Sequence, residues 1–283
     1  MPVDAVSLYG FMAESEAISY LENACILEPG ADLVALWTEA QAGLGPATPN
    51  AGRPNVRPIP ALFNAHLDTL ATEPWFQQFV ADSPWTFDLV EIAPLIAPQA
   101  QVMVEHSDAQ CAAVGSPPSM EELLALCLPV DRKSPDIRIE AGDKGLVLSS
   151  PDLNVSSMGP LWADLPSDGL FRGALLAGAV VRTRVPTVQV AKVDDRYYLN
   201  NGYHRVYCVG RKGAEYVPCV VLDFDTLDQA LGDIPAFDRD LLESRDPPTL
   251  AHFVGGRGAD VRVHRLQRVI AVSWTEATIR EGS

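Results

Sequence analysis

A run of strand and turn signals at residues 185–221 constrains the fold more than any other part of this 283-residue chain. The apolar residues Val188, Val190 and Val193 are typical of a half-buried strand. Asp194 and Asp195 then supply turn chemistry before a second short strand at 197–199. The sequence therefore predicts a β-hairpin.

A helix and a third strand are predicted to follow this hairpin. The polar residues and glycine at 200–202 favour a turn and a helix start, and Gly213 is placed to end a helix over 204–212 in the left-handed conformation. The β-branched residues at 217–221 predict the third strand. Pro218, near its start, is typical of a strand that enters or edges a sheet.

The junction between the hairpin and the helix has the chemistry of an anion site. A glycine-containing loop that opens into a helix presents free backbone N–H groups and the positive end of the helix dipole. His204 and Arg205 lie in the first turn, where an anion in front of the helix would explain a positive side chain. In the alternative interpretation Arg205 is solvated or paired with an acid, and His204 packs against the hairpin.

The order of these pieces resembles the ParB/sulfiredoxin-like superfamily. The matching segments are Val185-Pro186-Thr187-Val188-Gln189-Val190, Tyr197-Tyr198-Leu199, Gly202-Tyr203-His204-Arg205, Gly213 and Val217-Pro218-Cys219-Val220-Val221. The resemblance covers residues 185–221 and implies an α+β fold in which a mixed sheet and helices build a nucleotide pocket.

The resemblance also implies which residues hold the nucleotide. Gly202, His204 and Arg205 match a Gly-x-His-Arg turn whose backbone and arginine hold phosphates in nucleotide-binding members. The candidate phosphate and nucleotide site therefore comprises Asn201, Gly202, Tyr203, His204 and Arg205, with charge from Arg182 and Arg184. The implied ligand is ATP or CTP with magnesium.

Three departures from the family pattern weigh on its chemistry. Members that resemble free-serine kinases carry Asp-Gly-His-His-Arg, whereas Asn201 stands at the aspartate and Tyr203 at the first histidine. Sulfiredoxin carries a cysteine just before the His-Arg pair, so Tyr203 argues against peroxiredoxin repair, and Cys208 is expected to pack in the helix. No basic helix-turn-helix continuation follows residue 221, unlike the chromosome-partition members.

Charge and composition narrow the classes of partner. Thirty-seven acidic residues against 21 basic ones give a formal net charge of −16, which disfavours sequence-independent binding to nucleic acid. The absence of a long apolar run and the acidic N-terminus predict a cytoplasmic protein without a membrane span. The five cysteines show no C-x-x-C spacing, so neither a metal site nor a disulfide is expected, and all five are predicted to be reduced.

The rest of the chain predicts a helical N-terminal region at 1–83 and an α+β domain at 84–283 with its core motif at 185–221. Helices are expected at 10–25, 31–42 and 62–72, with a Pro/Gly-rich loop at 43–60. The aromatic residues at 75–80 and His66 are expected in the core rather than at a ligand site.

Further elements are predicted from local patterns. Ser119 and Glu122 form a capping box for a helix that runs to residue 126. The other expectations are strands at 85–96 and 101–105, a hairpin at 137–139 and 146–148, a short helix at 171–179 and a strand at 261–272.

Two functions from different classes remain open. The chain is either a nucleotide-using enzyme, a phosphotransferase or hydrolase with no identified general base, or a non-catalytic binding or scaffold module with a vestigial anion pocket. The scaffold would use the acidic N-terminal helices for a protein partner. A nuclease is a third alternative, which the acidic surface and the lack of a metal-ligand pattern disfavour.

Overall fold

The computed structural model describes residues 2–131, 136–142, 145–150, 155–164, 175–183, 185–232, 236–265 and 267–273. The chain forms two compact units. The larger unit joins Met1–Asp131 to Val185–Arg265, and the smaller unit joins Arg132–Arg184 to Leu266–Ser283. Helices together with one mixed sheet and further antiparallel sheets confirm the predicted α+β class.

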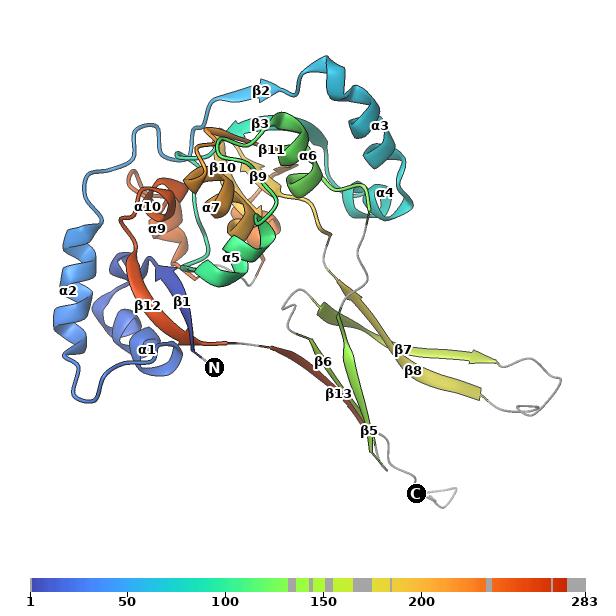
Figure 1. Cartoon of the computed structure of the whole chain (residues 1–283), viewed down its shortest axis with the longest axis horizontal. Coiled ribbons are helices and arrows are strands. Elements are labelled where there is room, and N and C mark those ends of the chain that lie inside the picture. The colour runs from blue at the N-terminus through green and yellow to red at the C-terminus, as the bar shows by residue number, and fades with distance from the viewer. Residues whose placement is uncertain are drawn as a thin grey trace. The chain divides into compact units, whose positions relative to one another are not determined.

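A five-stranded mixed sheet is the centre of the larger unit (Figure 1). Its strands, in spatial order, are β10 (Arg196–Asn201), β9 (Gln189–Val193), β11 (Tyr216–Phe224), β3 (Trp85–Glu91) and β2 (Val56–Pro58). β9 and β11 run parallel, and the other neighbours are antiparallel. Pro218 lies opposite Leu89 and before Val220, the first β11 residue paired with β9, so its missing N–H leaves the β9 ladder intact.

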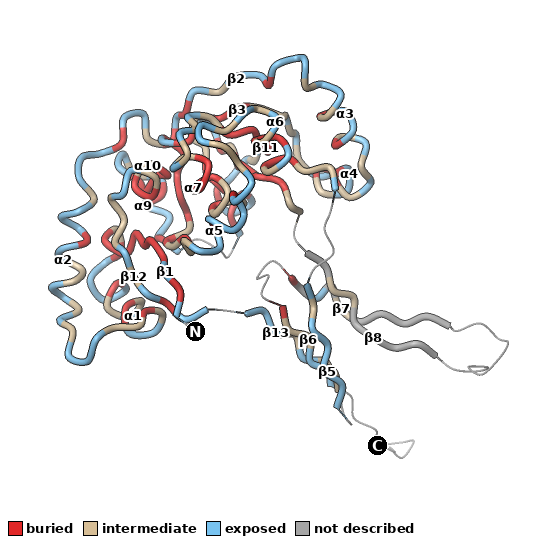
Figure 2. The backbone as a smooth tube through the Cα atoms, viewed as in Figure 1, coloured by how far each residue is buried: buried red, intermediate tan, exposed pale blue. Residues whose placement is uncertain are grey.

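Helix α7 (Tyr203–Arg211) connects the hairpin to β11, as the sequence predicts. Its buried residues Tyr203, Val206 and Tyr207 recur at three- and four-residue spacing, which turns one face of the helix toward the core. Gly213 follows it with a φ of +94°, the predicted left-handed termination. Figure 2 shows α7 and β11 among the most buried parts of the chain.

A second sheet contains a strand that the sequence analysis missed. Its order is β12 (Ala259–His264), β1 (Pro2–Ser7) and β4 (Gln101–Met103). The helices beside it in sequence are η1 (Tyr9–Phe11), α1 (Glu14–Ala24) and α2 (Leu33–Gly43). The helix predicted at 10–25 thus begins at Glu14, and the strand predicted at 261–272 divides into β12 and a separate strand of the smaller unit.

A second hydrophobic core lies under the helices that follow β2. These are η2 (Ala61–Phe63), α3 (Asn64–Thr72), α4 (Pro74–Val80) and, later in the chain, α6 (Met120–Cys127). Phe76 is fully buried and packs against Trp75, Trp85 and Phe87, so the aromatic residues are core as predicted. His66 Nε2 shares a 2.8 Å hydrogen bond with the Leu128 carbonyl.

The remaining helices of the larger unit are short. They are α5 (Val104–Gln110), α8 (Leu227–Leu231), α9 (Arg239–Glu243) and α10 (Leu250–Val254). Helix α6 begins at the predicted capping box, in which Ser119 Oγ accepts from the Glu122 N–H at 3.2 Å and Glu122 Oε2 accepts from the Ser119 N–H at 2.7 Å. In the described part of the chain no helix combines the length and the apolar character needed to span a bilayer.

The smaller unit is made of antiparallel strands. One sheet has the order β13 (Arg268–Ser273), β6 (Gly145–Ser150) and β5 (Arg138–Gly142), and β7 (Val155–Asp164) pairs with β8 (Leu175–Thr183). The predicted hairpin at 137–148 is confirmed by β5 and β6. The helix predicted at 171–179 is wrong for 175–179, where pairing with β7 extends the backbone; its first part lies outside the described residues.

The division of the chain differs from the predicted boundary between 83 and 84. Strand β2 from the N-terminal region pairs with β3, and β1 pairs with β4 and β12, so both predicted regions contribute to the same sheets. Long-range strand pairing, which composition does not reveal, sets this division.

The second core predicts a large cost for truncating its central ring. Phe76→Ala should lower the free energy of unfolding by about 3–5 kcal/mol, because a fully buried aromatic side chain leaves a cavity. Denaturant unfolding followed by tryptophan fluorescence measures the change, since Trp75 and Trp85 contact this ring. Leu62→Ala is the control, because Leu62 is 75% exposed, and an equal loss in both variants would contradict the assignment of this core.

Candidate functional site

The turn predicted to bind phosphate begins at a glycine in the left-handed region. Gly202 has a φ of +102° and precedes the first residue of α7. A Cβ atom at this position would come within 2.8 Å of Val188 Cγ2. The turn therefore requires glycine both for its backbone conformation and for its close approach to the strand segment before β9.

Arg205 directs its guanidinium group at backbone carbonyls. Its Nη1 donates to the carbonyls of Pro186 and, at 3.3 Å, Leu126, and its Nη2 donates to the Thr187 carbonyl at 3.2 Å. Burial lowers the pKa of Arg205. A guanidinium group keeps its charge in proteins, so a positive charge lies among these acceptors. Arg205 thus ties the end of α6 and the segment before β9 to α7.

Asn201 holds the same segment from the other side of Gly202. Its Nδ2 donates to the carbonyls of Val185 at 3.0 Å and Thr187 at 3.1 Å. The side-chain amide of Asn201 supplies N–H donors, which two backbone carbonyls can accept, whereas a carboxylate could not donate to them. Asn201 and Arg205 therefore act together as a clamp on residues 185–187.

His204 is a neutral acceptor in this structure. Its Nε2 accepts from the Met103 N–H at 3.2 Å, and its ring packs edge-on against His106 with ring centroids 4.6 Å apart. Burial, with smaller contributions from His106 and Arg205, lowers the pKa of His204 to about 3. An imidazole with this pKa carries no charge near neutral pH and offers no electrostatic attraction to a phosphate.

Tyr203 is buried at the start of α7. Its hydroxyl oxygen accepts from the Gln99 N–H at 3.0 Å, and burial raises the pKa of this phenol. Of the two remaining predicted residues, Arg182 lies in β8 without a described side chain, and Arg184 lies outside the described residues. The structure therefore gathers Asn201 and Arg205 on one backbone segment and directs Tyr203 and His204 to the segment at 99–103.

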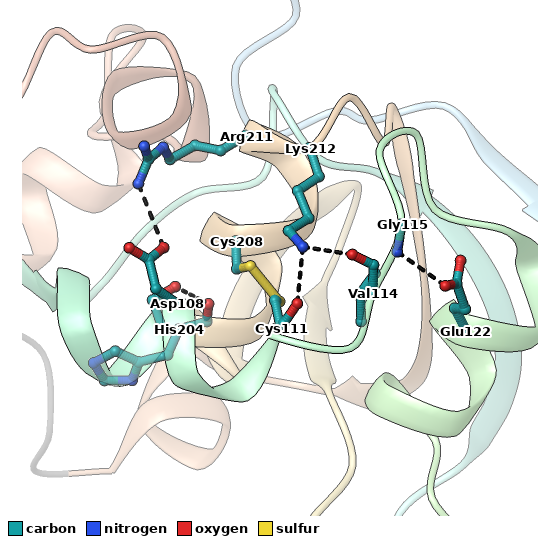
Figure 3. Close-up of a disulfide and its surroundings, with 10 residues drawn as sticks. Asp108, Cys111, Val114, Gly115, Glu122, His204, Cys208, Arg211 and Lys212 are labelled. Carbon is teal, nitrogen blue, oxygen red and sulfur yellow. Dashed lines mark hydrogen bonds and ion pairs between the residues drawn. A yellow bond between two sulfur atoms is a disulfide. The ribbon is translucent and has the colours of Figure 1, made fainter.

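A disulfide next to this turn corrects the expectation of five reduced cysteines. Cys111, which follows α5, is bonded to Cys208 of α7, 97 residues away in sequence (Figure 3). Cys25, Cys127 and Cys219 are free and buried. Spacing along the chain does not reveal such a pair, because the packing of α5 on α7 alone brings these two residues together.

Polar contacts reinforce the junction between α5 and α7. Lys212 Nζ donates to the carbonyls of Cys111 at 2.8 Å and Val114 at 2.5 Å, as Figure 3 shows. Ser107 Oγ donates to the His204 carbonyl at 2.5 Å. Together with the disulfide, these contacts hold α5 and the residues that follow it along α7, from its first turn to its C-terminal end.

Negative charge is concentrated in the first 131 residues. This segment contains 17 acidic residues and only two basic ones, Arg53 and Arg57, a formal charge of −15 out of the −16 of the whole chain. The acidic residues before Arg53 are all exposed and are Asp4, Glu14, Glu16, Glu22, Glu28, Asp32 and Glu39. Counting charge by segment would have revealed this asymmetry from the sequence.

A small cavity lies beside α2 in this acidic region. Its volume is about 290 Å³, and its lining includes Glu39 of α2, Asp260 of β12 and Arg257. Arg257 Nη1 donates to the Pro46 carbonyl at 3.0 Å, so part of its hydrogen-bonding capacity is used within the fold. Both carboxylates are exposed, and the cavity carries more negative than positive side chains.

Comparison with known proteins finds no matching family model, no matching curated protein and no matching solved structure. The ParB/sulfiredoxin-like resemblance therefore stays a prediction from the sequence.

The depressed pKa of His204 predicts a loss of stability in acid. The pKa is about 3 in the folded state and about 6.5 in an unfolded chain, so the unfolded state binds the extra proton between these values. The free energy of unfolding should therefore fall as the pH drops from about 6.5 toward 3, by up to about 1.4 kcal/mol per pH unit. Denaturant unfolding at a series of pH values measures this slope.

His204→Gln is the matched variant for this slope. Glutamine keeps an acceptor for the Met103 N–H but does not titrate, so its slope should be shallower over this range. Equal slopes for the two proteins would contradict the placement of His204.

The disulfide predicts the number of reactive thiols. In denaturant without reductant, alkylation followed by intact-mass measurement should label three cysteines, and after reduction it should label five. Cys111→Ser should leave four labelled cysteines under the first condition. Five labelled cysteines in the unreduced wild type would contradict the bond.

Proposed function

We propose that this protein is a non-catalytic binding module that presents an acidic surface to a cationic protein partner. The observation that carries this proposal is the internal use of the predicted phosphate turn. Its charged and amide side chains, Arg205 and Asn201, donate to backbone carbonyls of residues 126 and 185–187. Donors engaged in this way stabilise the fold and are not directed at a ligand.

The neutral state of His204 supports the same function. Phosphate binding draws on positive charge and donated hydrogen bonds, whereas His204 Nε2 accepts a hydrogen bond. A catalytic role would require a base poised near neutral pH, and burial moves the pKa of His204 well away from that range.

The negative charge of residues 1–131 supports a cationic partner. Seventeen acids against two bases in residues 1–131 favour association with a positively charged surface and raise the rate of encounter with it. The cavity lined by Glu39 and Asp260 is slightly smaller than the roughly 300–1,000 Å³ typical of small-molecule sites. We infer that it accepts a lysine or arginine side chain of the partner.

Nucleotide binding is the second candidate. The left-handed Gly202 at the start of the nine-residue helix α7 is the observation that favours it, because such a junction offers backbone N–H groups to a phosphate. ATP or CTP with magnesium would be the ligand. Nucleotide binding at this junction requires Asn201 and Arg205 to release the carbonyls of residues 185–187.

Substitution of Arg205 distinguishes these two candidates. Arg205→Ala should lower the free energy of unfolding by about 2–4 kcal/mol, because three carbonyls lose a charged donor. Arg211→Ala is the control, since its ion pair with Asp108 is exposed and should contribute little. Calorimetric titration of the wild type with ATP, CTP, GTP and ADP, with and without magnesium, should detect no binding. Nucleotide binding by the wild type that is lost in a folded Arg205→Ala variant would overturn the proposal.

A basic peptide tests the proposed partner class. A fluorescent heptalysine peptide should bind the full-length protein, whereas a heptaglutamate peptide should not. The double variant Glu39→Gln with Asp260→Asn should weaken heptalysine binding by roughly threefold to tenfold. Glu73→Gln with Asp82→Asn makes the same change in charge outside the cavity lining and should have a smaller effect. Equal losses in the two double variants would show that the cavity is not the contact.

A further inference from the structure

Among the described residues, the β5 strand is an uncovered edge of its sheet in the smaller unit. The sheet has the order β13-β6-β5, and within the described part of the chain β5 pairs only with β6. All five residues of β5 are exposed, which Figure 2 shows as a pale blue strand. An edge of this kind presents unpaired backbone N–H and C=O groups that can pair with another strand.

The side chains of β5 are complementary to themselves. Arg138 and Glu140 lie two residues apart on one face of the strand, and within the chain Arg138 Nε is 3.3 Å from Glu140 Oε1. In an antiparallel pair of β5 strands centred on Ile139, each Arg138 would lie opposite Glu140 of a second copy. Opposite charges facing each other across a strand pair are favourable, and this arrangement contains two such pairs.

Other centres of symmetry are less favourable. A two-fold axis perpendicular to the sheet places the central residue of the pair opposite itself. A centre at Glu140 or at Arg138 would bring two like charges directly together, which is destabilising. A centre at Ile139, which is 62% exposed, brings two apolar side chains together instead.

The register of the sheet extends this apolar contact. Ile139 lies opposite Leu148 of β6, and Leu148 lies opposite Ile270 of β13, so the three side chains form one row across the sheet. Two sheets joined at β5 would continue this row through both copies. The exposed isoleucine would then gain a neighbour on its open side.

The distribution of charge favours a second copy of this chain as the occupant. The smaller unit has nine basic and eight acidic residues, a formal charge of +1, whereas the larger unit has 12 basic and 29 acidic residues, a charge of −17. Two copies that approach through their larger units repel each other strongly. An approach through the smaller units brings together surfaces of little net charge.

We propose that the protein forms a symmetric dimer through antiparallel pairing of β5 with β5 of a second copy, centred on Ile139. The three-stranded sheets of the two copies then form one six-stranded sheet. The contact is isologous, with Arg138 and Glu140 of each copy facing Glu140 and Arg138 of the other.

Charge reversal in the full-length protein tests the partner and the register together. Sedimentation velocity should show a dimer for the wild type, and Arg138→Glu and Glu140→Arg should each raise the dimer dissociation constant by at least about tenfold. An equimolar mixture of these two single variants should restore the dimer, because each strand then faces opposite charges. The double variant R138E/E140R should also dimerise like the wild type.

The mixture separates pairing between copies from the ion pair within one chain. Each single variant lacks the internal pair of Arg138 and Glu140, so only contacts between the copies can make the mixture associate more tightly than its components. Thermal unfolding of each variant confirms that it is folded. A monomeric wild type, single variants that dimerise like the wild type, or a mixture that stays monomeric would each overturn the proposal.

A cross-link gives a second measurement of the centre. Ile139→Cys should form a covalent dimer when diamide oxidises the two facing thiols to a disulfide. Val147→Cys, at a 42% exposed position on β6, is the matched control and should not cross-link at the same rate. Equal cross-linking of the two variants would place the contact elsewhere.

Discussion

The clamp on residues 185–187 is the interaction on which the larger unit depends. This short segment leads into β9, and β9 together with β11 forms the parallel centre of the five-stranded sheet. Asn201 and Arg205 reach the segment from either side of Gly202, and Arg205 also reaches the end of α6. One turn therefore sets the positions of a helix, a sheet and the chain that enters the sheet. The loop has the sequence features of an anion site, but its arginine binds backbone carbonyls. A guanidinium group can donate hydrogen bonds to carbonyl oxygens as well as to phosphate oxygens.

The sequence predicted those elements that are determined by residues close together in the chain. The hairpin of β9 and β10, helix α7 and the capping box of α6 have the expected positions, because turn residues, caps and periodicity act within a few residues. Strand β1 was missed because its partners lie at 101–103 and 259–264. The sequence analysis predicted a helix for part of the short apolar run that forms β8. Pairing with β7 determines its extended conformation, and local preference does not reveal this pairing.

The sequence predicted which residues lie together at the candidate site, but not which groups their side chains contact. The pattern of the turn shows that residues 201–205 lie together, and this follows from their place between a hairpin and a helix. It does not show that Arg205 meets the carbonyls of Leu126 and Thr187, or that His204 meets the Met103 N–H. Those partners come from segments up to about a hundred residues away, whose path is set by the packing of α5 and α6. The bond between Cys111 and Cys208 depends on the same packing.

The pairing of β1 with β12 has a consequence for how the protein is made. Pro2 lies opposite His264, so β1 completes its sheet only after residues 259–264, far along the chain, have been synthesised. Until then one edge of β1 has no strand to pair with, although its residues Val3, Ala5 and Val6 belong to the buried core. Contacts so distant in sequence also slow folding, because a long loop must close before they contribute. Strand β1 therefore lacks one of its two neighbours until residues 259–264 leave the ribosome, and the exposed carboxylates between Asp4 and Glu39 keep this part of the chain hydrated during that interval.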